Sequence, residues 1–333
     1  MSAALSRDSL RALVAGWIEA GRTVIGPVQK QAGHVMFVPV RSAADLWLES
    51  WSPTGNSIKE SVFPRHERLY SYRIRKNDIE LIDEPEPVGE TIVIGAHPCQ
   101  AASLPILDKV FNWDFADELY NRRRAALTVV SLACSAFDDE CFCTSVGLGP
   151  AAEKGSDAML HEAADGFVVR TFTDKGRALF GEVSDSAPAA AAEGPPVRFD
   201  AKRVHDFARE EFDAPFWKEH ALACVGCGVC AYVCPTCHCF DIVDERRGDE
   251  GFRARNWDAC QFPMFTLHAS GHNPRHSQGD RQRQRIYHKF FLYREKFGEI
   301  LCTGCGACAR SCPAGLGVLP MVTEIPDAEP VQA

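Results

Sequence analysis

The sequence predicts an α+β protein in which a small α/β domain precedes a mainly helical domain. Three observations predict this class: short apolar runs alternate with helical patterns up to about residue 182, an Ala/Pro/Ser-rich segment covers 183–196, and one cysteine pattern occurs twice after it. Strands that alternate with helices favour a small, mostly parallel sheet. We therefore expect domains over 1–182 and 197–325, a linker over 183–196, and a frayed tail over 326–333.

The first 72 residues are predicted to form one helix followed by strands. Apolar residues at helical spacing predict a helix over 8–21, with Ser6 and Asp8 as candidate caps. Residues 24–25 and 35–40 have strand patterns, and 52–72 are expected to form a loop and a strand. The N-terminal helix pattern is amphipathic and contains no compact apolar run, which favours a folded helix over an export signal.

The α/β pattern begins at residue 91. Buried strands are predicted over 91–95, 127–131 and 166–170, and helices over 101–110 and 174–181. Ligand-binding residues of α/β sheets lie at the C-terminal ends of the strands, where Cys99 and Cys134 are expected. Residues 200–220, after the linker, are predicted to be helical.

The composition of the chain limits the classes of function that it can have. The chain has 333 residues, 46% of them hydrophobic and 24% charged, which is ordinary for a folded protein of two domains. No stretch approaches the roughly 18 apolar residues of a membrane helix. The net charge of −9 argues against nucleic acid as the main partner. Fifteen cysteines without an export signal predict a reducing, cytoplasmic location and metal ligation.

The repeated cysteine pattern is C-x-x-C-x-x-C-x-x-x-C-P, the bacterial ferredoxin run that holds [4Fe-4S] cubes. The first copy comprises Cys224, Cys227, Cys230 and Cys234, and the second comprises Cys302, Cys305, Cys308 and Cys312. Glycines between the cysteines, such as Gly226 and Gly304, are expected to take positive φ so that the backbone can approach sulfur.

In two-cluster ferredoxins the fourth cysteine of each run binds the other cube. Cluster 1 is therefore predicted to take Cys224, Cys227, Cys230 and Cys312, and cluster 2 to take Cys302, Cys305, Cys308 and Cys234. Structural zinc is the alternative, but zinc patterns show two separated C-x-x-C pairs and not three evenly spaced cysteines before a fourth.

Seven cysteines lie outside the two runs. Cys99, Cys134, Cys141 and Cys143 are predicted to form a third site, because they fall on loops of one domain and two of them form a C-x-C pair on a glycine-rich loop. This site would hold a third cube or zinc, and spacing does not decide between them.

The remaining three cysteines are Cys237, Cys239 and Cys260. Since both cubes already have four ligands, we expect these thiols to pack in the core or to donate hydrogen bonds to the clusters. The basic stretch 275–296 is expected to offset the negative charge of thiolate-ligated cubes or to dock an acidic partner.

Several motifs, in order, resemble one family. They are Gly95 to Cys99 (GAHPC), Cys134 with Cys141-Phe142-Cys143, the run CPTCHCFD, Trp257 to Cys260 (WDAC), Gly271 to Arg275 (GHNPR), Arg281 to Lys289 (RQRQRIYHK), and the second cluster run. Over residues 60 to 320 the chain resembles the 4Fe-4S β subunit of cytoplasmic bidirectional [NiFe] hydrogenases, the sulfhydrogenases. It is similar also to the A subunit of anaerobic sulfite reductase.

The resemblance implies an electron-transfer subunit without catalytic residues of its own. It would relay electrons between an FAD/NAD(P)-binding diaphorase subunit and the small and large [NiFe] hydrogenase subunits, or a sirohaem subunit of a sulfite reductase. The sequence contains no G-x-G-x-x-G, so NAD and flavin are expected on partners. Two other hypotheses are a reductase that acts on a sulfur compound through an exposed cube or the thiols of Cys237 and Cys239, and a zinc-stabilised binding module.

Overall fold

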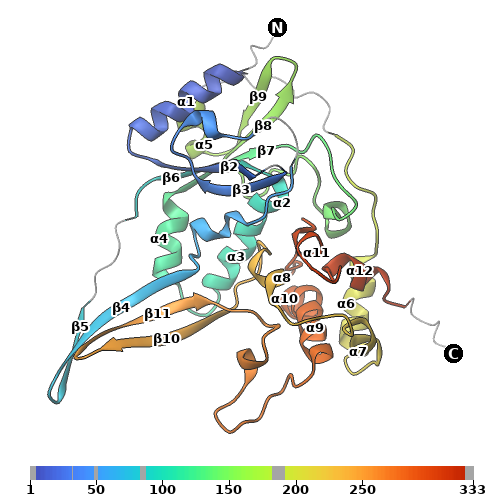
Figure 1. The fold of residues 1–333 in the computed structure, drawn as a ribbon. Coiled ribbons are helices and arrows are strands. Elements are labelled where there is room, and N and C mark those ends of the chain that lie inside the picture. Colours follow the sequence, from blue (N-terminus) through green and yellow to red (C-terminus); the bar gives the residue numbers. More distant parts are fainter. Residues whose placement is uncertain (1–4, 32, 49–51, 83–87, 182–191, 327–333) are drawn as a thin grey trace.

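The computed structural model describes residues 5–31, 33–48, 52–82, 88–181 and 192–326 (Figure 1). The chain contains both helices and strands, in agreement with the mixed composition of the predicted α+β class. Most of the predicted linker, from 183 to 191, and the tail from 327 onward lie outside the described residues. Among the described helices, none is both long enough and apolar enough to cross a membrane.

The first sheet has seven strands in the order β1-β9-β8-β7-β6-β2-β3. Their bounds are β1 Leu5–Ser6, β2 Thr23–Gln31, β3 His34–Pro39, β6 Thr91–Ala96, β7 Leu127–Leu132, β8 Ala158–Ala163 and β9 Gly166–Thr171. The central pairs β2–β6, β6–β7 and β7–β8 are parallel, but the outer pairs are antiparallel. The prediction of a mostly parallel sheet is therefore corrected to a mixed sheet, because β2–β3 and β8–β9 are hairpins, and a tight hairpin turn joins only antiparallel strands.

Helices cover both faces of this sheet (Figure 1). They are α1 Arg7–Glu19, α2 Pro98–Ala101, α3 Ser103–Phe111, α4 Glu118–Ala126 and α5 Asp174–Phe180. The predicted N-cap is confirmed, since the Ser6 side chain accepts a hydrogen bond from Ser9 N. Side chains of β6 alternate between two cores: Ile92 and Ile94 join the α1 cluster, whereas Val93 joins the α3 cluster.

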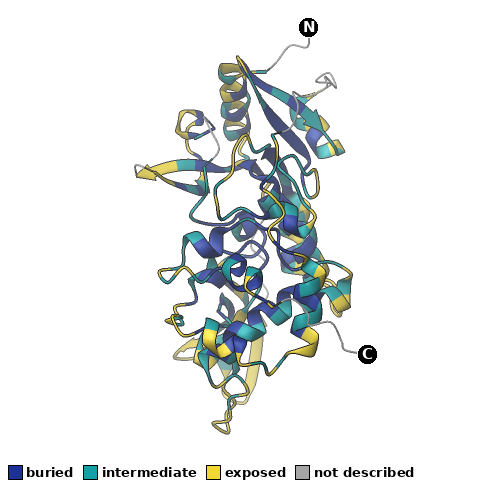
Figure 2. Cartoon of the chain, turned by 90° about the vertical axis from the view of Figure 1, so that its right-hand side faces the viewer, coloured by how far each residue is buried: buried dark blue, intermediate teal, exposed yellow. Residues whose placement is uncertain are grey.

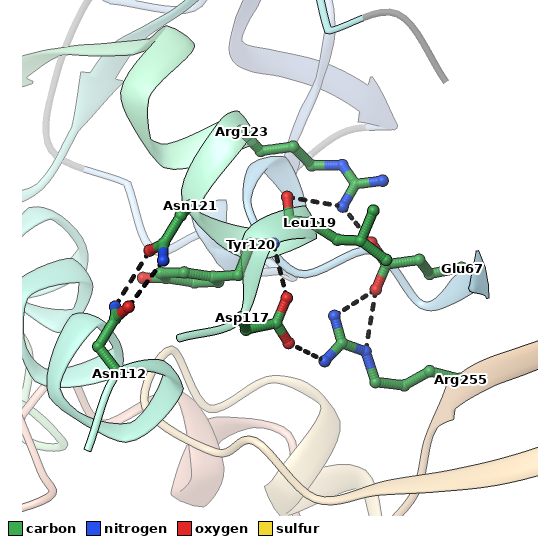
Figure 3. A network of polar contacts seen from close by, with 8 residues as sticks. All are labelled: Glu67, Asn112, Asp117, Leu119, Tyr120, Asn121, Arg123 and Arg255. Atoms are coloured by element: carbon green, nitrogen blue, oxygen red, sulfur yellow. Dashed lines mark hydrogen bonds and ion pairs between the residues drawn. The ribbon is translucent and has the colours of Figure 1, made fainter. Parts of the chain in front are cut away.

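A second, four-stranded antiparallel sheet has the order β10-β11-β4-β5. It consists of β4 His66–Arg75, β5 Asp78–Ile82, β10 Phe240–Arg247 and β11 Glu250–Trp257. The hairpin β10–β11 adds two strands to a second domain whose other regular elements are helical, as expected. Because β11 pairs with β4, segments from both sides of the predicted linker share one sheet, which projects as an arm in Figure 1. Its base is joined to α4 by the polar network drawn in Figure 3.

The cluster region is built from short helices. They are α6 Ala201–Glu210, α7 Phe216–His220, α8 Val229–Tyr232, α9 Gln278–Tyr287, the π-helical turn η5 His288–Leu292, α10 Tyr293–Phe297, α11 Ala307–Arg310 and α12 Val318–Thr323. The described residues also form the 3-10 turns η1 Ala43–Asp45, η2 Ile58–Ser61, η3 Cys143–Val146 and η4 Pro263–Thr266. The core of this region contains Cys230, Cys302 and Cys308, and it also takes Phe142 from the first region. Buried residues occur both in the sheet and in the helical region (Figure 2).

Candidate iron-sulfur centres

The two ferredoxin-type loops have the same backbone geometry. In the first loop Gly226 and Gly228 have φ of 68° and 74°, and in the second Gly304 and Gly306 have φ of 65° and 70°. The second glycine of each loop precedes a short helix, α8 or α11, that carries the third cysteine. The expected positive φ is therefore confirmed in both loops, and both runs fold the chain in the same way.

The second loop lies directly against the C-x-C segment of the first region. Phe142 N donates a hydrogen bond of 2.9 Å to Gly304 O. A Cβ on Gly304 would stand 2.5 Å from the backbone nitrogen of Cys143, so no other residue fits there without displacing that backbone. The first loop is packed in a similar way onto residues 259–262, since a Cβ on Gly228 would meet the Phe262 ring at 2.6 Å.

The four thiols predicted for cluster 2 lie together. Burial raises the pKa of Cys305, and the neighbouring thiols of Cys234, Cys308 and Cys302 raise it further. Burial likewise raises the pKa of Cys302 to about 11, against the effect of the nearby Lys289 ammonium. Buried thiols of this kind are held neutral until a metal displaces their protons.

Of the four thiols predicted for cluster 1, the structure places Cys224 and Cys230 near each other. The Cys230 thiol, whose pKa is raised to about 11 mainly by burial, neighbours Cys224 and also Cys308 of cluster 2. Cys227 is exposed on the same loop. Cys312 follows α11, where its Sγ accepts a hydrogen bond of 3.3 Å from Leu316 N. Its crossed assignment to cluster 1 stays a prediction.

Two glutamines of α9 contact the cluster 1 loop. Gln278 Nε2 and Gln282 Nε2 donate hydrogen bonds to Cys224 Sγ at 3.1 and 3.0 Å. Donors to a ligand sulfur stabilise its negative charge and raise the reduction potential of a cluster. No sequence motif predicts a role for these two residues, because a glutamine in a basic helix belongs to no known ligand pattern.

The four cysteines predicted for the third site are also brought together. Burial and then the thiols of Cys305, Cys134, Cys141 and Cys143 raise the pKa of Cys99. All five of these cysteines line one cavity. Cys99 lies on α2, directly after β6, and Cys134 follows β7, so the predicted position at the C-terminal ends of these strands is confirmed. Burial raises the pKa of Cys134 to about 12 and that of Cys141 to about 11.

Polar side chains position the third group. Arg310 donates to Cys141 Sγ at 3.1 Å and forms an ion pair with Asp138. His97 Nδ1 lies 3.7 Å from Cys134 Sγ, and its Nε2 lies 3.0 Å from Ser52 O. Because Arg310 belongs to α11, the second ferredoxin run also supplies the cation at the third site.

Three buried cations surround the thiols of the two ferredoxin runs. Lys59, Arg285 and Lys289 are each 2% exposed. Lys289 Nζ donates to Cys234 Sγ at 3.4 Å, and Lys59 Nζ donates to Cys237 O at 2.9 Å and Ala231 O at 3.1 Å. The guanidinium nitrogens of Arg285 have no hydrogen-bond partner, and thiols of both runs, Cys230, Cys308 and Cys234, are its charged neighbours.

Buried charges are normally paired, yet within the described part of the chain none of these three cations forms an ion pair with a carboxylate. Thiolate-ligated cubes would supply the missing negative charge. The residues present therefore fit two anionic clusters. Arg285 and Lys289 belong to the basic stretch that was expected to offset cluster charge, whereas Lys59 lies in a segment where no sequence pattern indicates such a role.

Two of the three remaining cysteines, Cys237 and Cys239, follow closely after Cys234, which is predicted to be a cluster ligand, and Cys260 pairs with Cys239. The Cys237 thiol hydrogen-bonds to Cys234 and is the main cause of its lowered pKa. Cys260 hydrogen-bonds with Cys239, which lowers the pKa of Cys260 to about 6. Cys237 thus occupies the place expected of a hydrogen-bond donor to a ligand sulfur.

Tetrahedral zinc requires its ligands to converge on one ion. Among the residues that the structure describes, no group of three or more His, Cys, Asp or Glu side chains is arranged to hold a metal ion in this way. The four thiolates of a cube bind four separate irons, so they need not converge on one ion.

The repeated loops and gathered thiols define a [4Fe-4S] dicluster protein, and residues 223–316 match the family model described as a 4Fe-4S dicluster domain. Over 324 residues the chain is 33% identical to sulfhydrogenase 2 subunit beta of Pyrococcus furiosus, covering 92% of this chain and 93% of that protein. The chain therefore belongs to the sulfhydrogenase beta-subunit family, as the motif order indicated, and has an electron-transfer role. No solved structure matches it.

Proposed function

We propose that this chain relays electrons between an FAD/NAD(P)H diaphorase subunit and a [NiFe] hydrogenase module in the cytoplasm. Cluster 1 and cluster 2 would be held by the crossed cysteine sets, and a third cube by Cys99, Cys134, Cys141 and Cys143. The clusters would supply the redox chemistry. The chain's own residues would bind them, exclude water, and set their potentials through buried cations and hydrogen bonds to sulfur.

The observation that carries this proposal is a row of neighbouring thiols that links the three predicted sites. Cys99 of the third group neighbours Cys305 of the second loop. Cys305 neighbours Cys308, and Cys308 neighbours Cys230 of the first loop. The exposed Cys227 lies on the same loop as Cys230. The centres would thus follow one another in the order third site, cluster 2, cluster 1, with cluster 2 in the middle.

The relay is tested on the complex purified with its partners in the absence of oxygen. Addition of NAD(P)H or hydrogen should bleach the visible absorption of the clusters within one turnover, and the isolated chain should oxidise neither compound. Clusters that stay oxidised while the complex turns over would contradict the relay. So would sulfur or sulfite reduction by the isolated chain with an artificial donor, which would favour a reductase in its own right.

The third site makes a separate prediction about metal content. Three cubes require about twelve irons per chain, and Cys143→Ser should lower this to about eight because the third cube loses a ligand. Iron, acid-labile sulfide and zinc are measured on the same sample, with Thr144→Ser on the same turn as the control. Loss of one zinc without loss of iron would show that the third group holds zinc.

A further inference from the structure

The cluster 1 loop reaches the surface at its second cysteine. Of the fifteen cysteines, all of which lie in described residues, Cys227 is the exposed one. Cluster 1 would therefore be the centre closest to solvent on this side, at the opposite end of the thiol row from the third site. A redox centre that reaches the surface allows electrons to cross to another protein, provided that the partner can come close.

Exposed large apolar side chains occur on the loop that carries this thiol and on a segment that packs against the loop. Leu222 and Val225, on the loop itself, are 85% and 71% exposed, and Met264 and Leu267 are 72% and 41% exposed. The two segments that carry them are in contact, since Gly228 lies against the ring of Phe262. We call these four side chains the collar. Clustered exposed apolar side chains of this size mark interaction sites and not ordinary surface.

The charge around the collar differs from that of the rest of the chain. The chain has 45 acidic residues and a net charge of −9, yet residues 221–239 and 259–279 contain no Asp or Glu. The second segment carries Arg275 and three histidines, His268, His272 and His276. A second copy of this chain would bring the same face without acids, so it would offer no charge complementarity. An acidic surface on a different partner would offer charge complementarity.

We propose that the collar is the docking surface through which cluster 1 exchanges electrons with a partner subunit that presents a redox centre within an acidic rim. This proposal rests on the relay function and adds to it the place of exchange and the chemistry of the partner. The apolar side chains would exclude water at the contact, as interface anchors do. The positive charge of Arg275 would offset part of the repulsion between two anionic redox centres.

The test adds negative charge to the collar without touching a ligand. Leu222→Glu with Met264→Glu should slow electron transfer between the subunits on the order of ten-fold or more, or release the partner, because two carboxylates would face an acidic rim. In the unaltered complex, transfer through this contact should slow as ionic strength rises, since salt screens opposite charges. The control is Ile79→Glu with Leu81→Glu on β5, where the same charges are added at side chains 60% and 66% exposed.

Iron content and reduction of the clusters by dithionite should be unchanged in both double variants. Wild-type transfer rates in the collar variant, or an equal loss in the β5 control, would overturn the docking proposal while leaving the relay intact. Self-association of the isolated chain that the collar variant abolishes, together with unaltered transfer in the complex, would assign the surface to a second copy and likewise overturn it.

Discussion

Replacing Cys305 with serine is expected to stop electron transfer through the chain while leaving the complex assembled. Cys305 neighbours three thiols of cluster 2 and also Cys99 of the third group, so it lies where two centres meet. Loss of an outer-shell partner alone costs 10- to 100-fold in metal affinity or activity. Loss of a ligand in the middle centre should therefore lower NAD(P)H-driven turnover by at least about 100-fold.

The measurement is turnover of the whole complex, together with iron content and co-purification of the partners. Cys305→Ser should lose about four irons per chain, the content of one cube. Thr303→Ser in the same loop keeps every thiol and should transfer at the normal rate. Unchanged turnover in the Cys305 variant, with the iron loss confirmed, would defeat the relay.

The geometry of the two ferredoxin-type loops was predictable because it is determined locally. Three cysteines spaced by two residues, with glycines between them, dictate a tight loop, and the structure places Gly226 and Gly304 at the expected positive φ. The third group was predictable for a related reason. Cys99 and Cys134 follow neighbouring parallel strands, and the ends of such strands meet at one edge of the sheet.

The second sheet was not predictable in the same way. Its strands β4 and β11 are almost 200 residues apart in the sequence, and a strand pattern in one segment does not indicate which distant segment pairs with it. Lys59 was missed for the same reason. Its role depends on packing against Trp257 of β11, with Nζ 4.0 Å from the ring centre, and this contact exists only once the two segments pair.

The pairing of these segments depends on a buried ion network, so Glu67→Gln is expected to destabilise the protein strongly. Glu67 on β4 is 4% exposed and forms ion pairs with Arg255 of β11 and Arg123 of α4 (Figure 3). Arg255 Nε donates to it at 2.9 Å, and Arg255 also pairs with Asp117. Removing one partner of a buried pair leaves an uncompensated charge and costs about 3–5 kcal/mol.

A matched control lies on the same sheet. Glu250 of β11 pairs with Arg73 of β4 at 2.7 Å, but these side chains are 69% and 40% exposed, and exposed pairs contribute at most about 1 kcal/mol. Denaturant unfolding of both variants without oxygen should therefore shift the midpoint far more for Glu67→Gln than for Glu250→Gln. Equal small shifts would mean that the network does not hold the arm to α4. In that case the contacts of the Trp257 ring with Phe63 and with the Lys59 ammonium would have to hold the arm against the rest of the protein.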